Sequence, residues 1–166
     1  MRQAGRRIVS TSLAALAVFS FGLLTGGPAA VGGSLPKCHG IPATVVGTRH
    51  ADLIRTGSGR DVVVGGGGDD VIHAGSGRDI VCGNRGIDSL LGNGTADHLF
   101  GGKGLDLLFG GKGNDQLFGQ SGGDWLDGGP QRDRCIGGKP GRDASGGSTP
   151  DFATGECEVT RGTTQL

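Results

Sequence analysis

Aromatic side chains are scarce: the 166 residues contain no Tyr, one Trp and six Phe. A chain with so few large side chains cannot build an ordinary globular core. Beyond residue 24 it also lacks any apolar run long enough to span a membrane. Glycine, in contrast, occurs 38 times. Either the chain is a flexible low-complexity segment, or glycine recurs at fixed positions where the backbone needs positive φ, and a period decides between the two.

Concentrated positive charge is absent as well. Residues 30–166 hold 13 Lys and Arg against 16 Asp and Glu, without a basic patch or interleaved Arg and aromatic residues. Nucleic acid is therefore not expected as a partner.

The N-terminus has the pattern of a secretory signal peptide. Arginines 2, 6 and 7 precede an apolar run over 8–24 and small residues over 26–33. We expect a signal peptide over 1–29, cleavage near Ala30 and an extracellular protein. The alternatives are a retained membrane anchor, for which the run is barely long enough, and a twin-arginine signal, which the residues after Arg7 fit poorly.

All four cysteines, Cys38, Cys82, Cys135 and Cys157, lie in the part expected to be exported. An even number in an oxidising compartment suggests two disulfides. Zinc is the alternative, but no two cysteines are separated by only two to four residues.

A nine-residue period organises the glycine. Rows of nine written from Gly47 carry Asp in the sixth column of all ten rows: Asp52, Asp61, Asp70, Asp79, Asp88, Asp97, Asp106, Asp115, Asp124 and Asp133. The eighth column is apolar in every row, from Ile54 to Cys135. Glycine occupies the first column in eight rows, the second in six and the fourth in seven. Asn occupies the second column in two further rows, and Asn tolerates the left-handed backbone conformation.

The rows resemble the calcium-binding nonapeptide G-G-x-G-x-D-x-U-x (U apolar) of RTX, or hemolysin-type, repeat proteins. Residues 65–73 (GGGGDDVIH) and 110–118 (GGKGNDQLF) match it closely, and the flanks resemble the caps of small exported actinobacterial members. The resemblance implies that Ca²⁺ is held by the ten Asp carboxylates and by turn carbonyls. The carbonyls expected to contribute are those of Gly66, Gly68, Gly86, Gly102, Gly104, Gly111, Gly113 and Gly122.

The spacing itself predicts an all-β, parallel β-roll (β-solenoid), and the resemblance implies that the roll is right-handed. Each row has three central residues suited to a strand and six suited to a turn; two rows make one coil, and coils stack roughly 4.8 Å apart. Asp52, Asp70, Asp88, Asp106 and Asp124 then lie on one edge (the odd edge), and the other five on the opposite edge (the even edge). Ca²⁺–oxygen distances of about 2.3–2.6 Å let an ion between two turns touch both. Five turns per edge leave four gaps, hence at most about eight ions.

The two edges should not bind equally. Arg60, Arg78 and Arg132 stand beside the ligand Asp on the even edge, where Thr95 and Gln131 also replace the fourth-column glycine. We therefore expect the strongest sites on the odd edge, between the turns of Asp70, Asp88, Asp106 and Asp124. The alternative is a metal-free solenoid whose Asp caps turns, but turn capping would tolerate Asn or Ser in the sixth column, and none occurs.

An apolar ladder on one outer face suggests how the ends attach. The ninth column of the even rows reads Val64, Cys82, Phe100, Phe118 and Ile136. We predict that the segment around Cys38 covers it through a Cys38–Cys82 disulfide, and that Cys135–Cys157 fastens a C-terminal cap. The rival interpretation is a docking surface for a partner. The histidines fall in different columns and are interpreted as surface residues.

The domain boundaries follow: signal peptide 1–29, N-terminal cap 30–46, roll 47–136, and C-terminal cap or tail 137–166. The segments outside the repeat are too short for a catalytic fold and no H-E-x-x-H occurs, so we expect no enzyme. The predicted function is a secreted monomer that folds on binding Ca²⁺ and does not contact the membrane after leader cleavage. The alternative is a calcium-stiffened adhesion or matrix scaffold that binds a cell-wall or protein partner.

Overall fold

The computed structural model describes residues 7–10, 35–140, 152–154 and 157–159. All regular structure in these ranges is β-strand. Consistent with this, the described part of the chain contains no helix long and apolar enough to cross a membrane.

Two seven-stranded parallel sheets face each other, with the order β1-β5-β7-β9-β11-β13-β15 in one and β16-β14-β12-β10-β8-β6-β4 in the other. We call the first the odd sheet, because its strands β5 to β13 begin in odd-numbered rows of the repeat. We call the second the even sheet, because its strands β6 to β14 begin in even-numbered rows. The odd sheet consists of β1 (Arg7–Ser10), β5 (Asp52–Arg55), β7 (Val71–Gly75), β9 (Ser89–Gly94), β11 (Leu107–Lys112), β13 (Trp125–Asp127) and β15 (Phe152–Thr154). The even sheet consists of β4 (Val45–Val46), β6 (Val62–Gly67), β8 (Ile80–Arg85), β10 (His98–Lys103), β12 (Gln116–Gly122), β14 (Asp133–Pro140) and β16 (Cys157–Val159).

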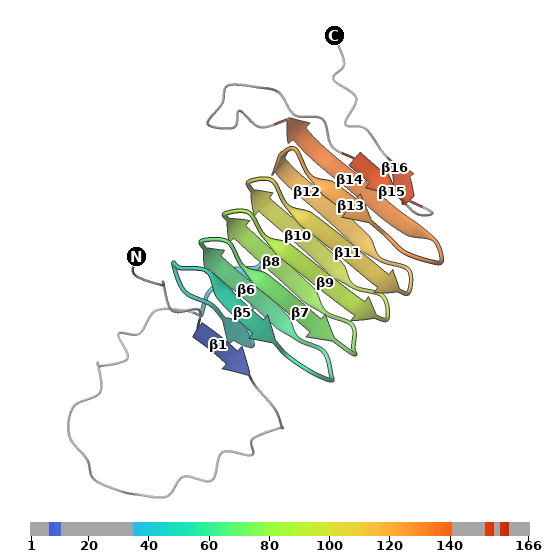
Figure 1. Ribbon diagram of the computed structural model, residues 1–166. Helices are drawn as coiled ribbons and strands as arrows, with labels where there is room; N and C mark the ends of the chain where they lie inside the picture. Colours follow the sequence, from blue (N-terminus) through green and yellow to red (C-terminus); the bar gives the residue numbers. More distant parts are fainter. Residues whose placement is uncertain (1–6, 11–34, 141–151, 155–156, 160–166) are drawn as a thin grey trace, which may run out of the picture.

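The register confirms that two rows make one coil. Leu99 pairs with Val81 on one side and Leu117 on the other, each 18 positions away. The chain alternates between the sheets as it advances, so successive coils stack along one axis (Figure 1). The parallel β-solenoid predicted from the nine-residue period is therefore confirmed.

The strands are longer than the three residues predicted. Six-residue strands such as Ile80–Arg85 and His98–Lys103 continue through the first three columns of the next row. They can do so because the first-column residue faces inward and glycine leaves that position open. The turn is correspondingly shorter and comprises the fourth to sixth columns.

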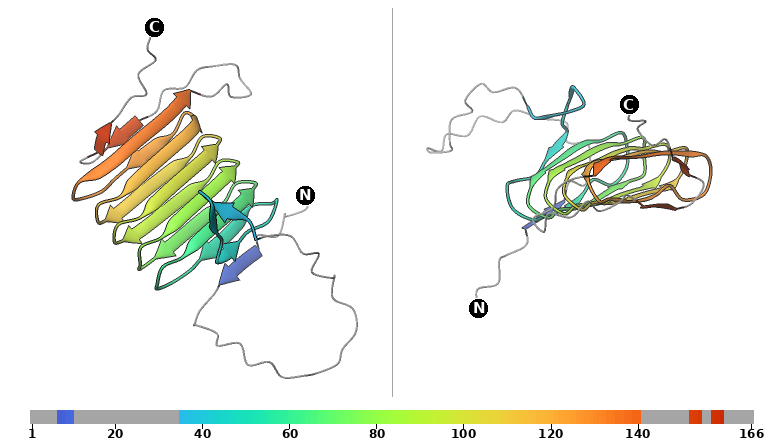
Figure 2. Two further views of the ribbon diagram at one scale, coloured as in Figure 1. Left: turned by 180° about the vertical axis from the view of Figure 1, so that it is seen from behind. Right: turned by 90° about the horizontal axis from the view of Figure 1, so that it is seen from above.

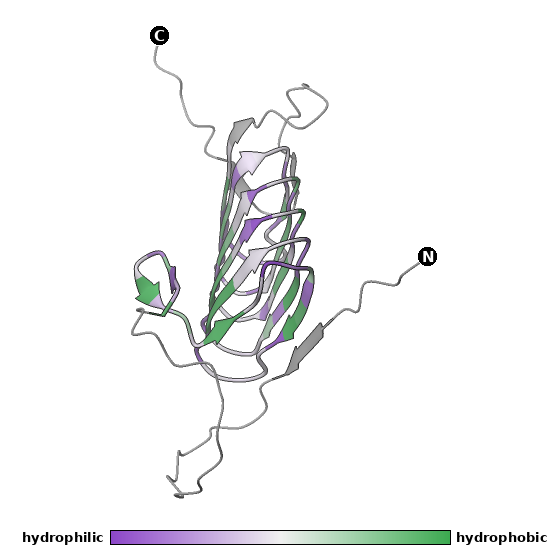
Figure 3. Cartoon of the chain, turned by 90° about the vertical axis from the view of Figure 1, so that its left-hand side faces the viewer, coloured by the Kyte–Doolittle hydropathy of each residue, from purple (hydrophilic) through white to green (hydrophobic). Residues whose placement is uncertain are grey.

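The core is a single file of side chains between the two sheets. Every eighth-column residue is at most 1% exposed: Ile54, Val63, Ile72, Val81, Leu90, Leu99, Leu108, Leu117, Leu126 and Cys135. Figure 3 shows the two layers edge-on, with little depth between them. One file of branched side chains is a small core for so long a stack, so other interactions must help to hold the coils in register.

The roll extends past the predicted limits of 47 and 136. β4 pairs in parallel with β6 through Val45 and Val63, which adds a strand before the first row. After the last row, β15 pairs with β13 and β16 with β14. β1 pairs with β5 and belongs to the segment predicted as a leader. Whether the leader is cleaved stays a prediction.

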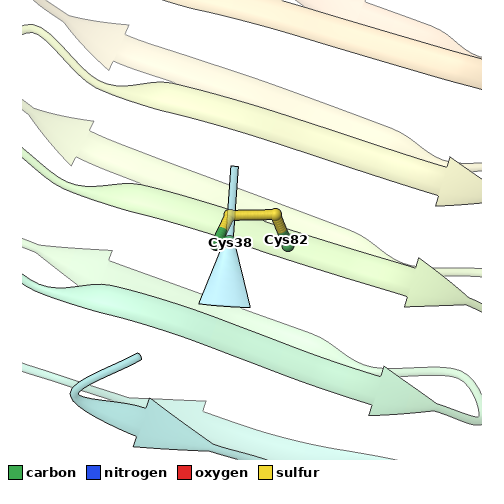
Figure 4. Close-up of a disulfide and its surroundings, with 2 residues drawn as sticks. All are labelled: Cys38 and Cys82. Carbon is green, nitrogen blue, oxygen red and sulfur yellow. A yellow bond between two sulfur atoms is a disulfide. The ribbon is translucent and has the colours of Figure 1, made fainter. Parts of the chain in front are cut away.

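The antiparallel hairpin of β2 (Lys37–Cys38) and β3 (Ile41–Pro42) lies on the outside of the even sheet near its N-terminal end (Figure 2). The disulfide Cys38–Cys82, with Cα atoms 5.7 Å apart, joins it to β8 (Figure 4). Cys38 packs with the outer side chains Val64, Cys82 and Phe100, all at most 8% exposed.

Aromatic stacking continues the cover along the ladder. His39 stacks on Phe100 with ring centroids 3.7 Å apart, and Phe100 stacks on Phe118 at 4.8 Å. The predicted N-terminal cover and its disulfide are thus confirmed. Cys135 is disulfide-bonded too; its pairing with Cys157 stays a prediction, because the side chain of Cys157 lies outside the described residues.

Candidate metal sites at the turns

The ten sixth-column aspartates lie inside the roll, at the ends of the turns. Nine of them are at most 4% exposed and Asp61 is partly exposed, although carboxylates normally remain in water. They face inward because side chains alternate along the strand, so a sixth-column residue points the same way as the apolar eighth-column residue. The repeat therefore places one file of carboxyl groups along each edge of the core.

One oxygen of each interior carboxyl group ties neighbouring coils together. The Oδ1 atom of Asp70 accepts the backbone N–H of Asp52 at 2.9 Å, and that of Asp106 accepts the N–H of Asp88 at 2.9 Å. The same bond, at 2.8–3.0 Å, joins every consecutive pair on both edges. Backbone donors at the turns are thereby satisfied from the next coil.

The second oxygen has no partner of this kind. Seven aspartates have a buried Oδ2 atom that accepts no hydrogen bond: Asp61, Asp70, Asp79, Asp88, Asp97, Asp106 and Asp115. Asp52 differs, since its Oδ2 accepts the N–H of Thr48 at 2.6 Å and its Oδ1 is left over. Each buried unsatisfied acceptor costs about 1–3 kcal/mol, and more if charged. Repeated buried acceptors of this kind favour a positively charged ligand at the turns.

Burial also raises the pKa values of these aspartates. The pKa is raised to about 7 for Asp70, Asp97 and Asp106, and to about 6 for Asp88 and Asp115. Desolvation is the largest cause, and repulsion from neighbouring aspartates adds to it. Without a cation, the roll therefore opposes ionisation of its own carboxyl groups at neutral pH.

Backbone oxygens line the same spaces between turns. A Cβ added to Gly104 would overlap the carbonyl oxygen of Gly86 and lie 3.3 Å from Asp106 Oδ1. A Cβ on Gly122 would overlap the Gly104 carbonyl and lie 3.0 Å from Asp124 Oδ1. Within the described part, the carbonyls of Gly68, Gly86 and Gly104 accept no hydrogen bond. Carboxylate and carbonyl oxygens with no protein donor are the ligands Ca²⁺ prefers, so these residues fit the ion.

The glycines predicted to contribute carbonyls have the backbone that was expected. All eight have φ between 93° and 155°. The carbonyls of Gly68, Gly86, Gly104 and Gly111 point towards the glycine one coil further on. The ligand role of all eight glycines stays a prediction. Asn84 and Asn93 have positive φ as predicted, and so do Gln120 and Gln131, which sequence reasoning did not single out.

Glycine in the first column has a different reason, which the sequence analysis missed. Its φ is not positive, but a Cβ on Gly101 would lie 2.5 Å from Asp106 Oδ2 and 2.9 Å from the Gly119 carbonyl oxygen. The aspartate of the same turn occupies the space. The fixed separation of five residues between first-column Gly and sixth-column Asp was the available signal.

The even edge differs from the odd edge in what fills its gaps. The Thr56 hydroxyl donates to the Ala74 carbonyl and the Thr95 hydroxyl to the Gly77 carbonyl, while the Gln131 side chain accepts the Gly113 N–H at 2.9 Å. The two Thr hydroxyls thus use carbonyl oxygens that could otherwise serve a cation, and the Gln131 side chain bridges two neighbouring turns. On the odd edge, the corresponding carbonyls of Gly68, Gly86 and Gly104 carry no such bond.

Two other site types can be set aside within the described residues. No three His, Cys, Asp or Glu side chains converge as a metal cluster, as expected where backbone oxygens supply much of the coordination. Residues 119–123 fit the G-x-S-x-G spacing of serine hydrolases, a match that sequence reasoning overlooked. That motif needs a strand–turn–helix, whereas Ser121 is an exposed residue of β12, and no helix follows it in the described part.

Comparison with known families agrees with this geometry. The family model for the RTX calcium-binding nonapeptide repeat, which describes four copies, matches residues 46–81, 82–117 and 109–139. Together these segments span more than half of the chain and include all ten sixth-column aspartates. A search of curated proteins gives no match. With its repeat, its stacked parallel coils and its two files of buried aspartates, this calcium-binding repeat protein belongs to the RTX nonapeptide repeat family.

Proposed function

We propose that this is an exported protein whose roll folds when Ca²⁺ ions bind between its stacked turns. The observation that carries the proposal is the set of seven buried Oδ2 atoms that accept no hydrogen bond. A file of such oxygens is destabilising by itself and becomes stabilising when cations neutralise it.

The balance between the two states follows from the composition of the roll. Without Ca²⁺, stacked carboxylates repel, and a single file of apolar side chains has to offset the conformational entropy of many glycines. We therefore expect a largely disordered metal-free chain. Binding should be cooperative, because each ion orders turns that its neighbours also use.

Affinity follows from the number of charges per ion. Each interior Asp borders two gaps, so each ion has about one carboxylate to itself. This predicts dissociation constants of roughly 10⁻⁴ to 10⁻³ M, the range of extracellular calcium modules. Such sites would be empty in the calcium-poor cytoplasm and filled outside the cell, which agrees with the predicted N-terminal leader and with the Cys38–Cys82 disulfide.

The ions should fill the odd edge first. Its turns keep unbonded carbonyls at Gly68, Gly86 and Gly104, whereas Thr56, Thr95 and Gln131 occupy gaps on the even edge. Eight ions is the upper limit set by the ten rows, and fewer are expected because the even-edge gaps are partly filled.

A calcium titration followed by far-UV circular dichroism tests the proposal. We expect a chelated chain with little β signal, a sigmoidal gain of β signal at millimolar or submillimolar Ca²⁺, and no comparable gain with Mg²⁺. Full β structure in excess chelator would contradict folding on calcium. Counting bound ions by equilibrium dialysis at saturation tests the limit of eight independently.

A second candidate function, an adhesion or matrix scaffold, is favoured by exposed apolar side chains. Leu107 and Trp125, on adjacent strands of the odd sheet, are 40% and 43% exposed, and Ile87 beside the Asp88 turn is 50% exposed. Apolar groups gathered on one face can serve a partner. Calcium-dependent sedimentation with cell-wall material, or self-association in ultracentrifugation, would support this function; a monomer without such binding would argue against it.

A further inference from the structure

Two arginines at the N-terminal end of the even edge form a surface feature that calcium binding does not use. Arg60 and Arg78 occupy the same column one coil apart, next to turns whose Ser58 and Ser76 are bridged in parallel. Together with Asp79, Ile80 and His98 they line a hollow of about 350 Å³.

Among the described residues, neither guanidinium group is paired with a carboxylate. No described acidic side chain lies within ion-pair distance of Arg60 or Arg78. Asp79, the acid in the lining, is 0% exposed and directs its Oδ1 to the backbone N–H of Asp61 at 2.8 Å. Arg60 and Arg78 thus extend from adjacent coils, whose backbones are roughly 4.8 Å apart along the axis, into the same hollow.

The turns beneath the arginines also depart from the repeat. Thr56 and Ala74 replace first-column glycine in these two rows alone. The Thr56 hydroxyl donates to the Ala74 carbonyl, and so closes part of the gap where a calcium ion would lie. The buried Oδ2 atoms of Asp61 and Asp79 still face the interior of this stretch, but the hollow beside its turns is lined by two arginines, so the hollow fits an anion better than a cation.

We propose that Arg60, Arg78 and His98 form a binding site for a phosphate-type oxyanion, such as the phosphoryl group of a phosphomonoester. Each guanidinium presents a planar fork of N–H donors, and two forks need at least three acceptor oxygens. A phosphoryl group has three terminal oxygens, whereas a carboxylate has two. The imidazole of His98 adds a further polar contact, and Ile80 gives the hollow an apolar wall.

The site is tested on the full calcium-loaded protein with glycerol 3-phosphate, whose calcium salt stays dissolved, measured by isothermal titration calorimetry. Glycerol and acetate serve as ligand controls. The test variant is Arg60→Asn with Arg78→Asn, because Asn114 occupies the same column and edge naturally. We expect binding to the native protein and a loss of at least about tenfold per arginine removed, the size of a charge-assisted contact.

Arg132→Asn is the matched control, since Arg132 lies in the same column and edge but outside the hollow. Its binding should be unchanged, and the calcium-dependent dichroism of all variants should match the native protein. Arginine side-chain N–H signals of the native protein, followed by NMR during the titration, give a result that does not depend on variant folding. The proposal is overturned if the phosphomonoester does not bind, if acetate binds as tightly, if Arg132→Asn loses as much, or if the signals of Arg60 and Arg78 do not shift.

Discussion

Replacing Asp106 by Asn should have opposite effects on the metal-free and the calcium-loaded protein. Asn keeps an oxygen that can accept the backbone N–H of Asp88, so the bond between coils survives. It removes the buried charge, however, and with it the carboxylate that borders two odd-edge gaps. The variant should therefore hold more β structure in chelator and bind fewer ions.

The size of the first effect follows from the pKa. Burial raises the pKa of Asp106 from 3.8 to about 7, so at pH 7.5 the folded metal-free state carries the cost of ionising this group. One pKa unit corresponds to about 1.4 kcal/mol, which gives a cost of about 4 kcal/mol as an upper value. The substitution removes this ionisation cost, and so raises the ratio of folded to unfolded metal-free chain by up to about three powers of ten.

Asp97→Asn is the matched control on the even edge. Burial raises the pKa of Asp97 to about 7 as well, so the gain in chelator should be similar. The loss of bound calcium should be smaller, because the Thr95 hydroxyl already uses the Gly77 carbonyl in the adjoining gap. The assays are far-UV circular dichroism in chelator at pH 7.5 and ion counting by equilibrium dialysis. An unchanged chelated state in both variants would refute the electrostatic reasoning, and equal calcium losses would refute the difference between the edges.

Three further predictions concern pH, packing and the disulfide. Because the buried aspartates have raised pKa values, the metal-free roll is most stable below about pH 4 and loses that stability as pH rises through 6–7. Circular dichroism in chelator from pH 4 to 8 should therefore show a β signal that falls with pH, and a rise would contradict this. Gly101→Ala should lower the calcium-loaded melting temperature, costing about 1–3 kcal/mol, because its Cβ meets Asp106 Oδ2, whereas Ala74→Gly should be far milder. Removing Cys38–Cys82, which closes a loop over a separation of 44 residues, should lower the free energy of unfolding by about 4 kcal/mol. It should also increase hydrophobic-dye binding on the even sheet; unchanged dye binding would show that the hairpin stays docked without the disulfide.

Much of this fold could be predicted from the sequence, because the nine-residue period is a property of the backbone path. The residue types found in each column indicate two rows per coil, a buried apolar file, and positive φ at Asn84 and Asn93. The Cys38–Cys82 pairing was accessible because Cys82 falls in an outward column that needs a cover.

Strand length could not be predicted, because it depends on pairing between neighbouring coils, and the packing reason for first-column glycine was missed although its fixed distance from the sixth-column Asp was a signal. A run such as GNR after Ile80–Cys82 has weak strand propensity, yet it continues β8 because the neighbouring coils pair with it. The extension of the roll by β15 and β16 was likewise hidden, because Phe152 pairs with Trp125 27 positions earlier and Cys157 pairs with Asp133 24 positions earlier, whereas paired strands inside the roll are 18 positions apart.

The hydrogen bonds of the aspartates give the stack a direction. Each Oδ1 accepts the backbone N–H of the aspartate 18 positions earlier, so every coil is completed by the one that follows it in the chain. A chain that emerges N-terminus first cannot finish a turn until the next coil has appeared. Shortening the protein from its C-terminus would leave a buried backbone donor without an acceptor, whereas shortening it from its N-terminus would leave only a carboxylate oxygen that water can solvate. The two ends of the roll are therefore not equivalent, and assembly and fraying should both be polar along the axis.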